Sequence, residues 1–136
     1  MRNIKYIAVH CTACSPTATV KSILNYWKNV KKWLVVGYHF LVEADGNINY
    51  LLPVSAVSNG VLGFNHCTIN VCYIGGIDKA GNPTDTRTDK QKASLLSILK
   101  KLKSDYPEAE ILGHKDFPNV AKACPSFEAK LEYSTL

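Results

Sequence analysis

Three side chains that could hold a metal ion stand in separate parts of the 136-residue chain. His10 and His114 each follow a short run of strand-forming residues, and Cys124 lies farther along, in a loop next to a proline. Two imidazoles and one thiolate are strong zinc ligands, and they leave a fourth position for water, as catalytic zinc sites do. A histidine after a strand is also often only hydrogen-bonded, and a lone cysteine is often only buried. Spacing alone therefore leaves both interpretations open.

Two further residues could take part in chemistry beside such a metal. Lys122 precedes Cys124 by two positions and could stabilise an oxyanion on a substrate carbonyl, or it could be a solvated loop lysine. Tyr38 could orient or help to deprotonate a metal-bound water, although the sequence pattern by itself favours a core aromatic. His39 follows directly. Because adjacent strand residues point to opposite faces, we expect only one of this pair to reach the site.

The other cysteines suggest alternatives to a single metal site. Cys11 and Cys14 have a C-x-x-C spacing, which redox pairs and zinc sites share, and Cys67 with Cys72 could complete a second zinc site. Against a redox pair, Pro16 interrupts any helix that would begin at these residues. Because the cysteine count is odd and no signal peptide is recognisable, we expect reduced thiols. Cys11 and Cys72 should be buried, and Cys14 and Cys67 should be the more exposed pair.

Composition predicts one ordinary globular domain over residues 1–136, with 46% hydrophobic and 20% charged residues. No apolar run is long enough for a membrane span or a secretory signal. We therefore expect a protein made in the cytoplasm that reaches any outside target by release. The net charge of +5 weakly favours an anionic partner. No phosphate loop or RNA-binding signature appears, so we expect neither nucleic acid nor membrane as a partner.

Strand-like and helix-like segments alternate along the chain, which predicts an α/β fold with a mixed sheet covered by helices. Asp45-Gly46 is a hairpin signal, and Thr88 with Gln91 forms a capping box at a helix start. The aperiodic region 53–66 is expected to be a long functional loop. The predicted strands are 4–9, 34–43, 47–52, 68–74 and 110–112, and the predicted helices are 19–32, 88–103 and 126–132.

Five segments, in this order, resemble the type 2 N-acetylmuramoyl-L-alanine amidases, zinc enzymes that share a domain with the peptidoglycan recognition proteins. The resemblance covers nearly the whole chain, which looks most like the small single-domain phage amidase lysozymes. The segments are VHCTA at 9–13, VGYHF at 36–40, VCYIGGID at 71–78, LGH at 112–114 and KACPSF at 122–127.

The resemblance implies a single domain with a mixed central sheet, flanking helices and a zinc groove on one face. It implies that His10, His114 and Cys124 bind zinc and that Tyr38 and Lys122 are catalytic. The implied reaction cleaves the amide between N-acetylmuramic acid and L-alanine, with peptidoglycan as the substrate. A lytic monomer of phage type, released through a holin or another export route, would fit this activity.

The chain departs from the family pattern at positions that we expect to affect the substrate groove. Cys67 and Asn70 stand where many relatives have Asn and Gly, and Asn59-Gly60 stands where relatives often have a histidine. The alternative function is a recognition module that binds peptidoglycan without cutting it. That subgroup typically lacks the cysteine ligand, so Cys124 favours catalysis. A structural or redox cysteine protein would leave the matches to the two catalytic residues unexplained.

Overall fold

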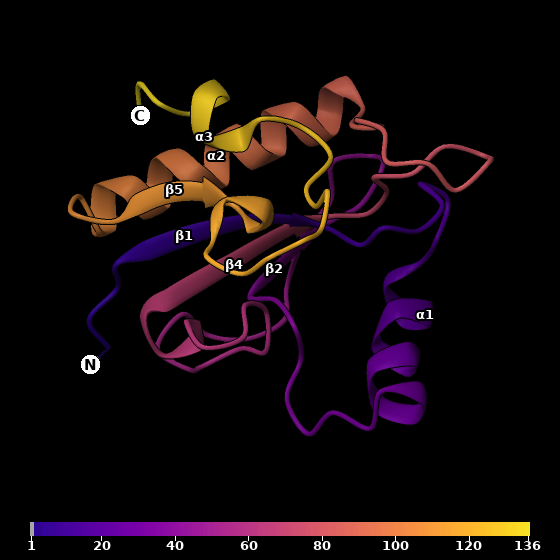
Figure 1. Cartoon of the computed structure of the whole chain (residues 1–136), viewed down its shortest axis with the longest axis horizontal. Coiled ribbons are helices and arrows are strands. Elements are labelled where there is room, and N and C mark those ends of the chain that lie inside the picture. Colours follow the sequence, from indigo (N-terminus) through magenta and orange to yellow (C-terminus); the bar gives the residue numbers. More distant parts are fainter. Residues whose placement is uncertain (1) are drawn as a thin grey trace.

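A five-stranded mixed sheet runs through the protein in a computed structural model that describes residues 2–136 (Figure 1). Within these residues the β2–β3 pair is antiparallel and the other strand pairs are parallel, which confirms the predicted mixed sheet. The strand order is β3-β2-β4-β1-β5. The strands are β1 (Tyr6–Cys11), β2 (Phe40–Val42), β3 (Ile48–Tyr50), β4 (Thr68–Tyr73) and β5 (Glu110–Gly113).

The two central strands, β1 and β4, are covered on both faces, which explains their nearly continuous apolar sequence. Side chains alternate between the faces. Ile7 and Val9 belong to the cluster that packs beneath α2 (Asp89–Asp105), whereas Ala8 belongs to a cluster on the opposite face. His10 follows Ala8 by two residues in β1, so the two side chains lie on the same face of the sheet. His10 therefore points away from the main core.

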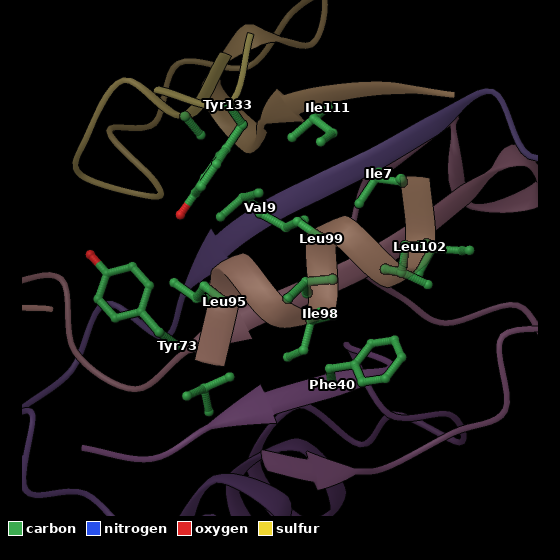
Figure 2. Packing of buried hydrophobic residues seen from close by; sticks show 14 of the residues in the cluster. Ile7, Val9, Phe40, Tyr73, Leu95, Ile98, Leu99, Leu102, Ile111 and Tyr133 are labelled. Carbon is green, nitrogen blue, oxygen red and sulfur yellow. The ribbon is translucent and has the colours of Figure 1, made fainter. Parts of the chain in front are cut away.

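The helix α2 covers one face of the sheet and supplies much of the core (Figure 2). Thr88 and Gln91 form the predicted capping box at its N-terminus. Burial of each aliphatic side chain contributes about 1.5–3 kcal/mol. The buried apolar side chains of α2 are Leu95, Ile98, Leu99 and Leu102.

The helix α1 (Val20–Asn25) begins at a capping box between Thr19 and Ser22 and continues as a π-helical turn over Tyr26–Val30. Together they match the helix predicted for 19–32. Figure 1 shows this segment on the other side of the sheet from α2. Part of it packs on the sheet, because Ile23 and Trp27 are buried against Leu41 of β2.

Two predicted elements are shorter in the structure. The strand predicted for 34–43 is confined to β2, because the preceding segment wraps around aromatic rings. A Cβ on Gly37 would lie 3.2 Å from the rings of both Trp27 and Trp33. The helix predicted for 126–132 is confined to α3 (Ala129–Glu132). Ser126 cannot start it, since its φ is +69° and its hydroxyl donates to the carbonyl of Gly76.

The C-terminal segment is fastened to the rest of the protein by the buried Arg87. Its guanidinium forms ion pairs with Asp85 and Glu132 and donates to the Tyr133 hydroxyl. It also stacks 3.4 Å from the centroid of the Phe127 ring. These contacts anchor Phe127, Glu132 and Tyr133, and thus the segment after Cys124, to the segment before α2. In the part of the chain that the structure describes, no helix is long and apolar enough to cross a bilayer.

Substitution of Leu99 by alanine should lower the free energy of unfolding by about 2–5 kcal/mol, because it opens a cavity between α2 and the sheet. Leu99 is fully buried, whereas Leu96 on the same helix is 37% exposed. Leu96→Ala is therefore the matched control, with an expected change within about 0.5 kcal/mol. Urea unfolding measures both variants, and equal losses would contradict the packing described.

Candidate metal centre

The parallel pairing of β1 with β5 places two histidines side by side. Val9 is the partner of Gly113 in this register, so His10 and His114 are the next residues of the two neighbouring segments, with His114 directly after the end of β5. Their ring centroids are 4.7 Å apart. His114 also begins a short 3-10 turn, His114–Asp116, which takes the chain out of the sheet at this point. Segments more than a hundred residues apart in sequence thus bring two imidazoles together.

The loop that follows returns Cys124 to the same end of β1. The backbone N–H of Lys115 donates to the carbonyl of Cys124 over 2.9 Å, and the N–H of Cys11 donates to its Sγ over 3.2 Å. Gly113 permits this approach, because a Cβ there would lie 2.8 Å from the Pro125 ring. The Pro125 carbonyl accepts a further hydrogen bond from the Tyr73 hydroxyl.

The potential ligand atoms of His10, His114 and Cys124 all lie within 4.8 Å of one another. The Nδ1 atom of His10 faces the Cys124 Sγ at 4.0 Å. His10 is buried, and the other two residues are half-buried, so one side of the group is open. Two nitrogens and one sulfur suit zinc and similar borderline-soft metals. The three predicted ligands therefore form a possible metal-binding triad.

The environment keeps both imidazoles neutral, as metal ligation requires. Burial, together with the positive charges of His114 and Lys122, lowers the pKa of His10 to about 3. Burial and the charge of Lys122 lower the pKa of His114 to about 4. Both values lie well below neutral pH. Each ring therefore offers a lone pair there without first releasing a proton.

The two candidate catalytic residues also lie near the triad. The ring of Tyr38 is 4.9 Å from that of His10, between centroids, and burial raises the pKa of its phenol well above the ordinary value. Lys122 is on an exposed loop, and its charge acts on both histidines. His39 does not join them, because its ring is buried beside Ser58 and Ala56. Tyr38 thus lies beside the triad and His39 does not, although both residues precede β2 and neither belongs to a strand.

A cavity of about 420 Å³ opens beside Tyr38, between α1 and the turn that follows β1. Its lining is mostly apolar. A segment bound there would contact Tyr38, whose ring lies beside that of His10. The residues around it are Thr12, Ala13, Cys14, Ala18, Ser22, Ile23, Tyr26, Trp27 and Tyr38.

The remaining cysteines are unpaired, and no disulfide joins any of the five cysteines within residues 2–136. Cys11 and Cys72 are buried, as predicted, and Cys14 is half-buried. The prediction for Cys67 is wrong, because a 3-10 turn over Asn65–Cys67 folds its side chain inward to 4% exposure.

Sequence reasoning missed the position of Asn70. The sequence predicts only an effect of this residue on the substrate groove, whereas the structure buries it against His10, with its Oδ1 atom 2.8 Å from the imidazole Nε2. The signal was a single amide within the otherwise strand-like run Thr68–Tyr73. A buried polar side chain in a central strand needs a partner. Asn70 pairs with Ala8, two residues before His10, so its side chain lies on the same face of the sheet as that of His10.

The metal-free protein should become less stable as the pH falls from about 6.5 towards 4. In the folded state His10 and His114 stay neutral until the pH comes close to 4, whereas unfolded histidines with the ordinary pKa of 6.5 take up protons over this range. Where the unfolded state binds more protons than the folded state, stability decreases as the pH is lowered. Urea unfolding with chelator present should give a flatter profile for His10→Gln. The exposed His66 supplies the control variant, His66→Gln, and an unchanged slope in His10→Gln would refute this account.

Comparison with known proteins places these features in a family. The family model described as N-acetylmuramoyl-L-alanine amidase matches residues 1–127. The endolysin of Klebsiella phage KP32 is 39% identical over 125 residues, which are 91% of this chain and 82% of that protein.

Solved structures show the same fold. The Ph2119 endolysin, from a bacteriophage of Thermus scotoductus MAT2119, superposes with a TM-score of 0.80 at 26% identity, covering 92% of this chain and 79% of that one. PGRP-SA of bumblebee superposes with a TM-score of 0.78 at 19% identity, covering 99% and 86%. With the family match over nearly its whole length, the chain belongs to the N-acetylmuramoyl-L-alanine amidase family.

Proposed function

We propose that this protein is a zinc-dependent amidase of phage type that hydrolyses bacterial peptidoglycan. The observation that carries the proposal is the convergence of His10, His114 and Cys124 in a chain of this family. Tyr38, which lies beside His10, also lines an open cavity. Three protein ligands with a fourth position left for water are the arrangement of catalytic zinc. The bond cleaved is the amide between the lactyl group of N-acetylmuramic acid and L-alanine.

The residues of the chain divide the chemistry among them. His10, His114 and Cys124 would hold a zinc ion, which would supply a water of lowered pKa, about 7, and a positive charge to polarise a carbonyl oxygen. Tyr38 keeps its proton at neutral pH, as an ordinary phenol does, and burial raises its pKa further. It can therefore hold the attacking oxygen by a hydrogen bond and help to pass a proton to the leaving nitrogen. Lys122 supplies a positive charge for the oxyanion that develops on the lactyl carbonyl.

The cavity beside Tyr38 suits the peptide part of the substrate. It combines apolar walls from Ile23 and Trp27 with hydroxyl groups from Thr12 and Ser22. A short peptide presents methyl groups and amides to such a surface. Peptidoglycan is thus the proposed partner. We further propose that the chain acts as a monomer and that it reaches the cell wall after release from the cytoplasm. The name endolysin, given to the phage KP32 relative, supports this setting.

A recognition module that binds peptidoglycan without cutting it is the competing function. Such a module needs neither a metal-binding triad nor a buried phenol next to it. The presence of Cys124, Tyr38 and Lys122 around one open position favours hydrolysis.

Purified peptidoglycan distinguishes the two functions. The protein should release stem peptides that begin with L-alanine and leave the glycan strands intact, as mass spectrometry of the products shows. A strong chelator should abolish release, and zinc should restore it. Binding without any new amino termini would favour the recognition module.

Replacement of Cys124 by serine should strongly weaken zinc retention, because a soft thiolate ligand is lost. Cys14→Ser is the matched control, since Cys14 is also half-buried but lies outside the triad. Metal analysis after dialysis should find one zinc per chain in the wild type and in this control. Full zinc occupancy and full activity in Cys124→Ser would remove the assignment.

The variants Tyr38→Phe and Lys122→Ala should keep the fold and the zinc but lose much of the rate. Removal of one oxyanion donor commonly costs about 10²–10³ in kcat. Tyr50→Phe and Lys130→Ala remove the same groups from exposed positions and should retain wild-type turnover. Wild-type rates in the first two variants would point to a different catalytic set.

A further inference from the structure

A chain of buried polar groups contacts His10 at Nε2, the ring nitrogen that does not face Cys124. Asn70, Ser58 and His39 are each at most 1% exposed, like His10 itself. These groups belong to strand β4, the long loop before it and the residue that precedes β2. None of them is a candidate ligand or catalytic residue. Because burial of an unpaired polar group is costly, their hydrogen bonds define one consistent arrangement.

The direction of these hydrogen bonds is set at His39. The backbone N–H of Asn70 can only donate, and it meets the Nδ1 atom of His39 at 3.0 Å. The proton of this ring is therefore on Nε2, which donates to the carbonyl of Ala56 over 2.8 Å. The Nη2 group of Arg2 lies 3.3 Å from the same Nε2 and donates to the carbonyl of Val54 instead. The Ser58 hydroxyl, 3.3 Å from the same Nδ1, must donate as well. The lone pairs of its oxygen remain free to accept.

The orientation of the Asn70 amide follows from this arrangement. Its Nδ2 group donates to the Ser58 hydroxyl oxygen over 2.7 Å, so its Oδ1 atom faces His10. That oxygen lies 2.8 Å from His10 Nε2 and can only accept. His10 is thereby held with its proton on Nε2. The lone pair of Nδ1, the atom that faces Cys124, is left free for a metal.

Gly60 makes room for this amide. A Cβ at position 60 would lie 2.4, 2.5 and 2.6 Å from the three terminal atoms of the Asn70 side chain. The loop is fixed at this point, because the N–H groups of Gly60 and Val61 both donate to Asn65 Oδ1, over 3.0 and 2.7 Å. A larger residue at position 60 would therefore displace the amide.

We propose that Asn70 is a positioning residue that fixes the tautomer and ring orientation of His10 for metal binding, with Ser58 and His39 orienting its amide and Gly60 accommodating it. The proposal rests on the metal function proposed above. Groups that hold the second nitrogen of a ligand histidine typically change metal affinity by about 10–100-fold. Asn70 thus acts through His10 and does not touch the substrate.

Zinc affinity, measured on the folded protein by competition with a chromophoric chelator, is the first test. Asn70→Ala should bind zinc about 10–100-fold more weakly than the wild type. Asn70→Asp keeps an acceptor for Nε2–H and should recover most of the affinity. Gly60→Ala should lose affinity although Asn70 is still present. Asn49→Ala, which removes an amide that bonds to Leu41 and Glu43 elsewhere in the sheet, is the matched control and should bind like the wild type.

The tautomer of His10 in the metal-free protein is the second test, and it does not depend on zinc binding. Nitrogen-15 chemical shifts of the imidazole should show the Nε2–H form in the wild type and a mixture of tautomers in Asn70→Ala. Wild-type zinc affinity together with an unchanged tautomer in Asn70→Ala would overturn the proposal. If that variant fails to fold, the same two results for Gly60→Ala would overturn it.

These measurements separate the two proposals. A wild-type protein that binds no zinc would contradict the proposed function, while its tautomer would still decide the role of Asn70. Tight zinc binding in both the wild type and Asn70→Ala, with cooperative unfolding in each, would leave the metal site intact and reject the positioning role.

Discussion

The parallel pairing of β1 with β4 and β5 is the interaction on which the candidate site depends. Alignment of Val9 with Gly113 delivers His10 and His114 to neighbouring positions where the strands end. The pairing with β4 puts Asn70 on the same face as His10, one diagonal step away. A shift of one residue in either register would turn these side chains to the opposite face. The core beneath α2, which specifies the register through its apolar side chains, is therefore also what specifies the site.

The site combines a dry side with an open side. Behind His10, a closed set of hydrogen bonds runs through Asn70 to the backbone, and burial keeps the imidazole neutral. In front, His114 and Cys124 are half-buried and Lys122 is exposed, so water and substrate can enter. Such an arrangement suits the proposed metal-assisted hydrolysis. The imidazole of His10 is already oriented for a metal, so it does not have to be reoriented in each catalytic cycle.

Local patterns predicted much of the fold. The end of β1 at His10 and Cys11 and the capping box before α2 depend on neighbouring residues, which sequence shows directly. The residue types of the three candidate ligands were visible in the sequence, but their convergence was predicted only from the family resemblance, because contacts between distant segments have no local signature. The burial of Cys67 and the contact of Asn70 with His10 were missed for the same reason. Each depends on how the long loop packs against β4.

X-ray absorption at the zinc edge of the zinc-loaded wild-type protein measures the ligand set most directly. With His10, His114 and Cys124 as ligands, the first shell should contain one sulfur at about 2.3 Å and three nitrogen or oxygen atoms at about 2.0–2.1 Å. Outer-shell scattering should show two imidazoles. A first shell with no sulfur, or with two or more sulfurs, would contradict this site and would direct attention to the other cysteines.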